Sequence, residues 1–341
     1  MNGRAPAEAG TPYSLSGECA LCNFCVLRFG RFAIQERVLA AFATTILFSI
    51  SAVCGRRAAA VLGGTEANFW RLCFAAILLA VYAHVYGAGL SGTALGVFFF
   101  SGCIGFGIGD MALFQALPRI GSRLSVMLVL CLSSPLAAAL EWAWLGTPLT
   151  APQIGCAVLI LAGVAVALSP GREFHLTRKA FTIGVFFGLI AAICQGYGAV
   201  LSRKAFALAD AAGENIDGIT AAYQRILGGV LLTAIFVLVV NRKNLRLWPG
   251  QSDHAVQKLE QWRKAWALVL LNGLSGPALG VSCYQWALKI TGTGIVLPIV
   301  ALTPIVIIPF SRFLEGEKPT KRSIFGGAVA VLGAILLAIL K

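Results

Sequence analysis

Ten long apolar runs, separated by short polar segments, organise this sequence. A helix needs about 20 apolar residues to cross a bilayer. The predicted spans are residues 38–59, 67–87, 94–117, 124–145, 152–169, 180–202, 218–240, 265–288, 293–314 and 322–340. Hydrophobic residues make up 58% of the chain and charged residues 12%, which excludes a soluble globular protein. Because backbone polar groups in lipid must bond within the protein, the sequence predicts an all-α polytopic membrane protein with ten transmembrane helices.

The second half of these spans repeats the first half. The segment AVCGRRAAA at 52–60 returns as AVLSRKAFA at 199–207, and further matches follow in the same order. The matched pairs are Arg71 with Arg225; Gly102, Gly105 and Gly109 with Gly273, Gly276 and Gly280; Gly121 with Gly292; Pro135 with Pro304; and Thr150 with Thr320. Each unit holds five spans, and an odd number makes the second unit enter the membrane from the opposite side. We expect two inverted five-helix repeats, at residues 38–170 and 180–340, after a polar N-terminal tail at residues 1–37.

Several motifs that occur in both units resemble a known family. They are an arginine in the second span (FWRLCFAAILLA and YQRILGGVLL), a proline in the fourth (LCLSSPLAAAL and ALTPIVIIPF), and the turn and helix EGEKPTKRSIFGGAVAVLGAIL. On these motifs, nearly all of residues 38–340 resembles the drug/metabolite transporter superfamily, in its ten-helix branch with two EamA-type domains. One departure is Thr147, where the family usually has Glu. The resemblance implies a secondary transporter that exports small metabolites such as amino acids by alternating access.

Acidic residues inside the spans are candidates for ion coupling. A mid-helix Asp costs about 2.5–3.5 kcal/mol on insertion, so it should face the protein interior or water. Asp110 is such a residue, and the second repeat has apolar Val281 at its position. It is our first candidate for a proton site; the alternative is a structural Asp at a helix crossing. Glu141 is the second candidate, although its neighbour Trp142 is typical of the membrane interface.

Arg71 and Arg225 occupy equivalent positions near the start of their spans. Each side chain can extend to the lipid headgroups or anchor a neighbouring helix. The functional alternative is that a half-buried guanidinium holds an anionic substrate group, or pairs with Asp110 until protonation releases it.

Further polar and aromatic residues inside the spans favour a polar cavity. They are Gln115, Gln195, Tyr197, Tyr223, Gln224, Tyr284, Gln285 and Trp286. Each of them could instead join helices by hydrogen bonds. The repeated glycines, at Gly102, Gly105, Gly109, Gly273, Gly276 and Gly280, should form stripes on which helices pack closely, before any contact with a ligand.

Other kinds of site have little support in the sequence. Cys19, Cys22 and Cys25 have a metal-like spacing but no fourth ligand in the tail, so we expect neither a metal nor a cofactor. GFGIGD at 105–110 follows no strand and lies in an apolar helix, which argues against a nucleotide cradle. The basic residues lie between apolar runs, so the net charge of +13 indicates contact with membrane lipids and not with nucleic acid.

The sequence thus predicts a transporter and not an enzyme. Its expected partners are a small-molecule substrate and membrane lipids, its expected location is the inner cell membrane, and either a monomer or a homodimer is compatible with the pattern. The alternative is a membrane-embedded enzyme or a lipid-handling protein. That alternative requires paired acid and base groups or a metal cluster near one leaflet, and the sequence shows neither.

Overall fold

The computed structural model describes residues 20–145, 150–168, 177–245, 252–290, 299–316 and 319–340, with the side chains of 20–38, 138, 141–145, 168, 240–245, 252–255, 288, 290 and 338 left aside. The first repeat contains α1 (Ala20–Leu62), α2 (Gly64–Val85), α3 (Leu95–Gly102), the π-helix η1 (Cys103–Gly109), α4 (Asp110–Ile120), α5 (Ser122–Leu145) and α6 (Ala151–Leu168). The second contains α7 (Arg178–Ala211), α8 (Gly218–Leu245), α9 (Ser252–Gly273), the π-helix η2 (Leu274–Gly280), α10 (Val281–Ile290), α12 (Thr303–Glu315) and α13 (Lys321–Ile339).

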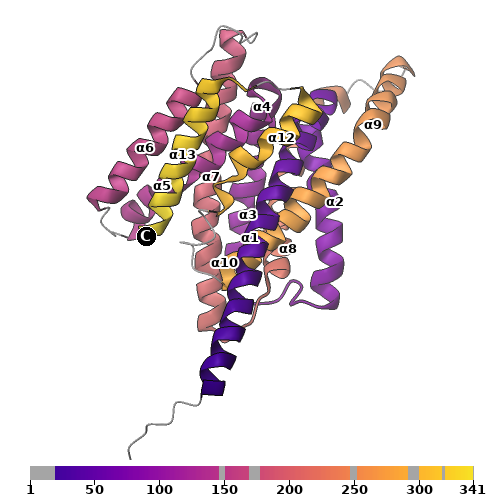
Figure 1. The fold of residues 1–341 in the computed structure, drawn as a ribbon. Coiled ribbons are helices and arrows are strands. Elements are labelled where there is room, and N and C mark those ends of the chain that lie inside the picture. Colours follow the sequence, from indigo (N-terminus) through magenta and orange to yellow (C-terminus); the bar gives the residue numbers. More distant parts are fainter. Residues whose placement is uncertain are drawn as a thin grey trace, which may run out of the picture.

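These elements confirm the expected ten-helix architecture over the described residues. α3, η1 and α4 follow one another without a break, as do α9, η2 and α10, so each set makes one rod (Figure 1). Six helices are long and apolar enough to cross a membrane, and the apolar segments 122–137 and 151–167 are shorter. α1 begins at Ala20, within the segment expected to be a polar tail.

The two repeats run in opposite directions through the bundle. The second half of α1 reaches Ser122 at the start of α5, because Arg56 and Ser122 bind the same carboxylate. α7, the counterpart of α1, begins at this same end, where Gly184 packs on Ile120 of α4. We call this end, at the top of Figure 1, the upper end, and the opposite end the lower end.

The helices of the two repeats are interleaved and do not form two separate halves. α2 packs on α8, α5 on α7, and α6 on α13, so each of these pairs takes one helix from each repeat. The α6–α13 contact depends on small residues: Gly163 faces the backbone of Ala330, and Gly326 faces that of Ala167.

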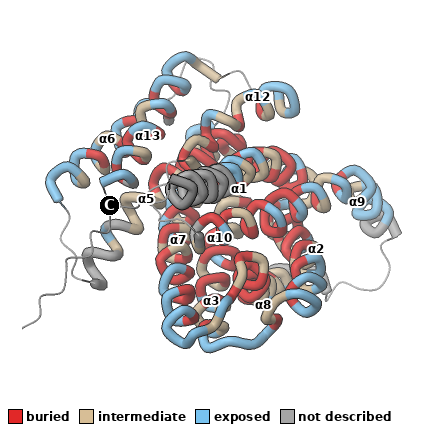
Figure 2. Tube along the Cα trace, turned by 60° about the horizontal axis from the view of Figure 1, so that its bottom comes forward, coloured by how far each residue is buried: buried red, intermediate tan, exposed pale blue. Residues whose placement is uncertain are grey.

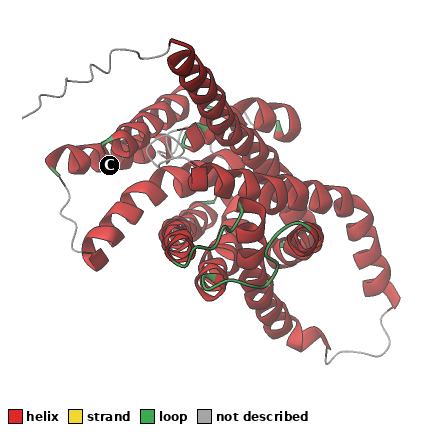
Figure 3. Cartoon of the chain, turned by 90° about the horizontal axis from the view of Figure 1, so that it is seen from below, coloured by secondary structure: helices red, strands yellow, loops and turns green. Residues whose placement is uncertain are grey.

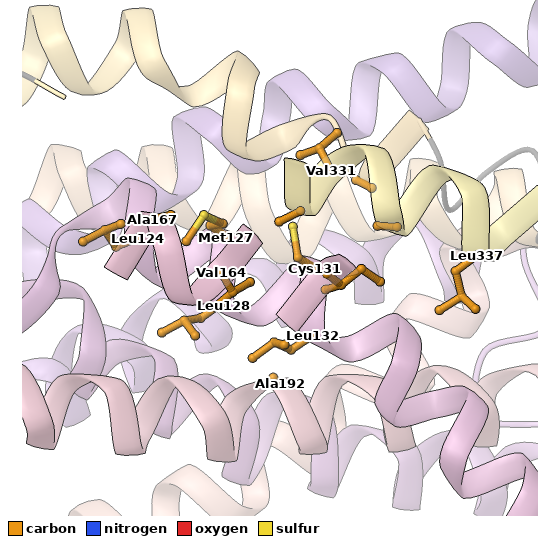
Figure 4. Close-up of a cluster of buried hydrophobic side chains, with 14 of the residues drawn as sticks. Leu124, Met127, Leu128, Cys131, Leu132, Val164, Ala167, Ala192, Val331 and Leu337 are labelled. Atoms are coloured by element: carbon orange, nitrogen blue, oxygen red, sulfur yellow. The ribbon is translucent and has the colours of Figure 1, made fainter. Parts of the chain in front are cut away.

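Within this bundle, α5, α6 and α13 share a large apolar core. Leu128, Val164 and Val331, one from each of these helices, are buried in it (Figure 4). α12 lies against α5 and α13 and also against α1. We call α5, α6, α12 and α13 the lateral group, and the helices α1–α4 and α7–α10 the central group.

The outer surface of the bundle is apolar, as expected for contact with lipid. Ile77, Val81 and Leu238 are between 60% and 65% exposed. Figure 2 shows the exposed positions on the outer sides of the helices and the buried ones where helices face one another. Some hydroxyls inside the bundle bond to their own helix; Thr44, for example, donates to the carbonyl of Ala40.

Candidate functional site

A cavity of about 100 Å³ lies among helices of the central group, with α5 of the lateral group as one wall. α1 contributes Phe48 and Ser51 to its wall, and α5 contributes Val126. Arg71 from α2 and Asp110 from α4 supply charge to the same cavity. The cavity therefore combines helices from the two groups and carries a cation and an anion.

Arg71 and Asp110 form a buried ion pair on this wall. A terminal nitrogen of Arg71 donates to Oδ2 of Asp110, and the side chains are only 5% and 15% exposed. Nε of Arg71 donates to Oδ1 of Asn68, one helical turn earlier, at 2.9 Å. The guanidinium also lies over the ring of Phe114, 4.5 Å from its centroid. These contacts fix the guanidinium beside the carboxylate.

Asp110 owes its position to the π-helix that precedes it. The segment 103–109 was expected to continue an α-helix, but it is wound as the π-helix η1, and Asp110 is the first residue of α4. The second repeat has the π-helix η2 at the equivalent place, ending before Val281. π-helical turns occur often at functional sites because they change which side chains face a neighbour.

Arg225 occupies the equivalent position of the second repeat but has different surroundings. Ala222 and Val281 stand where the first repeat has Asn68 and Asp110. Arg225 is 5% exposed and lies over the ring of Phe106, 5.4 Å from its centroid. Its buried Nε has no hydrogen-bond partner. Among the described residues, the duplicated scaffold thus carries this ion pair at Arg71 and not at Arg225.

Each arginine helix packs against the π-helical rod of the other repeat. A Cβ on Gly102 would lie 1.7 Å from the carbonyl oxygen of Arg225, and one on Gly273 would lie 2.8 Å from that of Arg71. Gly105 and Gly276 face the guanidinium groups. A Cβ on Gly105 would lie 3.3 Å from a guanidinium nitrogen of Arg225, and one on Gly276 would lie 3.4 Å from a guanidinium nitrogen of Arg71. These glycines let the two backbones approach closely.

The remaining glycines of the two predicted stripes have other neighbours. Gly109 faces Cys194 of α7, and Gly280 faces Phe48 of α1. The glycines of each rod therefore meet more than one helix, because the π-helical winding turns them away from a single α-helical stripe.

At the upper end, three polar side chains join the lateral and central groups. Glu315 at the end of α12 accepts from Arg56 of α1 at 2.6 Å and from the hydroxyl of Ser122 of α5 at 2.7 Å. Arg56 lies one turn beyond Ala52, and Ser122 one turn before Val126, and both Ala52 and Val126 line the cavity. We call Arg56, Ser122 and Glu315 the upper cluster.

The other predicted site residues are distributed over several places. Gln195 lines the cavity. Gln115 lies near the upper end, where it contacts Thr65 and Arg119. Tyr197 is half-buried on α7 and does not line this cavity.

Four predicted residues lie closer to the lower end. Gln224 donates to the carbonyls of Gly89 and Ser91, so it holds the loop after α2. Tyr223 is buried and lies 3.2 Å from a ring nitrogen of His84. Gln285 is completely buried, and neither of its amide atoms has a hydrogen-bond partner. Trp286 is 42% exposed and lines a second pocket.

The remaining residues singled out in the sequence are Tyr284, Glu141 and the three cysteines near the N-terminus. Tyr284 is buried in an apolar cluster, with its ring centroid 6.4 Å from that of Phe48. The side chain of Glu141 lies outside the described residues, as do those of Cys19, Cys22 and Cys25. Among the residues that are described, no group of three His, Cys, Asp or Glu side chains is placed to hold a metal ion.

The sequence prediction missed two buried polar contacts. Asn68 orients Arg71, and Ser51 donates to Oδ1 of Asn272 at 2.8 Å across the two repeats. Asn68 could have been found, because it lies three residues before Arg71 on the same helix face and its counterpart is Ala222. The partner of Ser51 is 221 residues away, and no local pattern indicates such a contact.

Interleaved inverted repeats with a charged cavity near their middle are typical of secondary membrane transporters. The family model for the EamA-like transporter family matches residues 36–169 and 182–339, so the chain belongs to that family. It is a multi-pass membrane transporter of the drug/metabolite type and not an enzyme.

The other comparisons add information on the fold. No curated protein matches this chain. A solved structure titled "Crystal structure of protein" is similar to it, with a TM-score of 0.57 and 17% sequence identity over 90% of this chain and 97% of the other. At this identity the likeness supports the fold alone.

Proposed function

We propose that the protein is a secondary transporter that exports small metabolites, such as amino acids, in exchange for protons. The observation that carries this proposal is the Arg71–Asp110 pair on the cavity wall. A zwitterionic solute can enter between these two groups, with its carboxylate on the guanidinium and its ammonium on the carboxylate. Its two new charge pairs then replace the single pair of the empty site.

Exchange follows because the solute and a proton compete for the same carboxylate. The solute's ammonium requires Asp110 to be charged, whereas a proton on Asp110 removes that charge. A site that holds one or the other, and exposes them alternately on the two sides of the membrane, couples outward movement of the solute to inward movement of a proton. The absence of such a pair at Arg225 restricts this coupling to the first repeat.

The test is transport in proteoliposomes with and without a pH gradient, for wild type and for Asp110→Asn. The solutes are amino acids, nucleosides, sugars and organic cations. We expect gradient-driven flux of an amino acid in the wild type and its loss in Asp110→Asn, because the neutral amide takes up no proton and binds the solute's ammonium only weakly. Glu260→Gln, which removes an exposed acid from α9, is the matched control.

Two results would contradict the proposal. Gradient-driven flux that persists in Asp110→Asn would show that this carboxylate does not carry the proton. Absence of flux for every solute, with protein that is inserted and monodisperse, would exclude export of these metabolites. We further propose that the protein acts in the inner cell membrane, in contact with its lipids.

A further inference from the structure

A second pocket, of about 390 Å³, lies at the lower end of the bundle. It forms where α2 and α10 end and α8 begins, and Figure 3 views the molecule from this end. Tyr82, Tyr86 and Trp286 supply aromatic surface, and Asp217 and Lys289 supply one charge of each sign. The pocket shares none of its lining residues with the central cavity.

The two charged groups of this pocket are held by neutral partners. Oδ1 of Asp217 accepts from the backbone nitrogens of Ile219 and Thr220, both at 2.9 Å, and so caps α8, while Oδ2 accepts from the hydroxyl of Thr220. Lys289 donates to Oδ1 of Asn215. In the described part of the chain, Asp217 and Lys289 do not pair with each other. Neither charge is therefore neutralised by the other, although both groups already make hydrogen bonds to neutral partners.

A buried apolar layer separates the two pockets. Leu72, Ala75 and Leu79 of α2 follow Arg71 along the helix and precede Tyr82, and they pack with Tyr223 and Val281. On α10, Val281 lines the central cavity and Lys289 lines the lower pocket. Gln285 lies midway between these two on the same face of the helix, at i+4 from Val281.

Gln285 is the polar side chain between Val281 and Lys289 on this face of α10, and its amide group makes no hydrogen bond. It is completely buried, and both its amide nitrogen and its amide oxygen lack hydrogen-bond partners. Leaving such a group unpaired costs about 1–3 kcal/mol. Such a group would gain hydrogen-bond partners from a polar solute or water that reached it.

We infer that the lower pocket is a second binding site on the transport path, for a small zwitterion with an apolar or aromatic side chain. Lys289 binds the carboxylate, Asp217 binds the ammonium, and the rings of Tyr82 and Trp286 hold the side chain. Gln285 then lies on the route from this pocket to the Arg71–Asp110 pair. The inference rests on the proposed transport function, but it concerns a separate set of residues.

The test is equilibrium binding of radiolabelled L-phenylalanine to the full chain in lipid nanodiscs. Asp110→Asn serves as the background, because it weakens the central site and leaves the lower pocket unchanged. In this background we expect saturable binding, and Lys289→Gln should raise the Kd about tenfold by removing a charge-assisted hydrogen bond. 3-Phenylpropionate and phenethylamine, which each lack one charge of the zwitterion, should compete more weakly than unlabelled L-phenylalanine.

Two further variants test the same pocket in case Lys289→Gln does not fold. Asp217→Asn removes the charge but keeps an oxygen that can cap α8, and Trp286→Leu changes a partly exposed side chain; each should also weaken binding. Lys179→Gln, an exposed lysine at the start of α7 near the upper end, is the matched control and should bind like the background.

The possible outcomes separate this inference from the proposed function. No binding in the Asp110→Asn background, or a Kd that Lys289→Gln leaves unchanged, would overturn the second site even if the wild type shows gradient-driven flux. Binding that depends on Lys289 in a protein without flux would support the second site and count against the proposed transport cycle.

Discussion

Arg71 and Arg225 show how two equivalent residues can acquire different surroundings after a duplication. Arg71 has Asn68 and Asp110 as hydrogen-bond partners, whereas Arg225 stacks on Phe106 with an unpartnered Nε. A buried ion pair contributes little net stability, but removing one partner leaves an uncompensated charge. Stability alone therefore gives no reason for the pair.

This asymmetry predicts a non-additive double-mutant cycle. Arg71→Met and Asp110→Leu should each lower the free energy of unfolding by about 3 kcal/mol, because each leaves one buried charge alone. The double variant should recover most of that loss while losing gradient-driven flux. Reversible unfolding in mixed micelles measures these free energies, and additive costs would contradict the assigned pairing.

Gln285 gives a second prediction at the scale of one residue. Gln285→Leu replaces two unpaired buried polar atoms with an apolar group of similar size, so we expect a gain of about 1–3 kcal/mol in the free energy of unfolding. If the side chain lies on the solute's route, flux should fall at the same time, while L-phenylalanine binding at the lower pocket stays the same. A variant that is stabilised and transports at the wild-type rate would place the route elsewhere.

At the scale of elements, the crossing of α3 and α8 depends on glycine. Gly102 faces the carbonyl of Arg225, and Gly228 in turn faces the carbonyl of Phe99, 2.1 Å from where its Cβ would be. The two backbones are in direct contact at this point, and they bring Arg225 next to η1.

We therefore expect Gly102→Ala to separate these helices. The added methyl group overlaps a backbone oxygen, which cannot rotate away, and the free energy of unfolding should fall by about 2–3 kcal/mol. Gly96→Ala is the control within the same helix, because nothing lies within 4 Å of its Cβ; its effect should stay within about 0.5 kcal/mol. Equal stability of the two variants would contradict the close crossing.

For the whole molecule, interleaving decides which parts can move. Each five-helix repeat contacts the other along most of its helices, so rocking of the repeats as two separate bodies would break most of these contacts. The central cavity has α5 of the lateral group as one wall, and the upper cluster joins the lateral group and the central group at the upper end. We expect alternating access to move the lateral group relative to the central group, with the contact between α5 and α7 rearranging.

A cross-link between the groups tests this view of the motion. In a background without the native cysteines, Arg56→Cys/Glu315→Cys joined by a reducible bis-maleimide should bind L-phenylalanine but lose flux, and reduction should restore the flux. Gln153→Cys/Leu340→Cys joins α6 to the end of α13, where the Gln153 amide lies 3.2 Å from the carbonyl of Leu340, and should leave flux intact. Flux that survives the first cross-link would exclude this motion.

The amino-acid sequence alone was sufficient to predict the ten helices, the duplication and the opposite direction of the second repeat. Hydropathy and repeat spacing are properties of short segments, and a bilayer leaves an apolar segment few alternatives to a helix. The unusual polarity of Asp110 could be found in the same way, because the second repeat provided an apolar residue for comparison.

Only the tertiary structure decided which polar residues meet. Gln195 lines the cavity with Arg71 and Asp110, whereas Gln224 holds a loop, Tyr284 lies in an apolar cluster, and Trp286 faces the lower pocket. The π-helical turns change the direction of Asp110 and of the glycines beside it, and no hydropathy pattern distinguishes π from α winding. Such contacts join residues far apart in sequence, and they depend on crossing geometry that the packing of all the helices sets together.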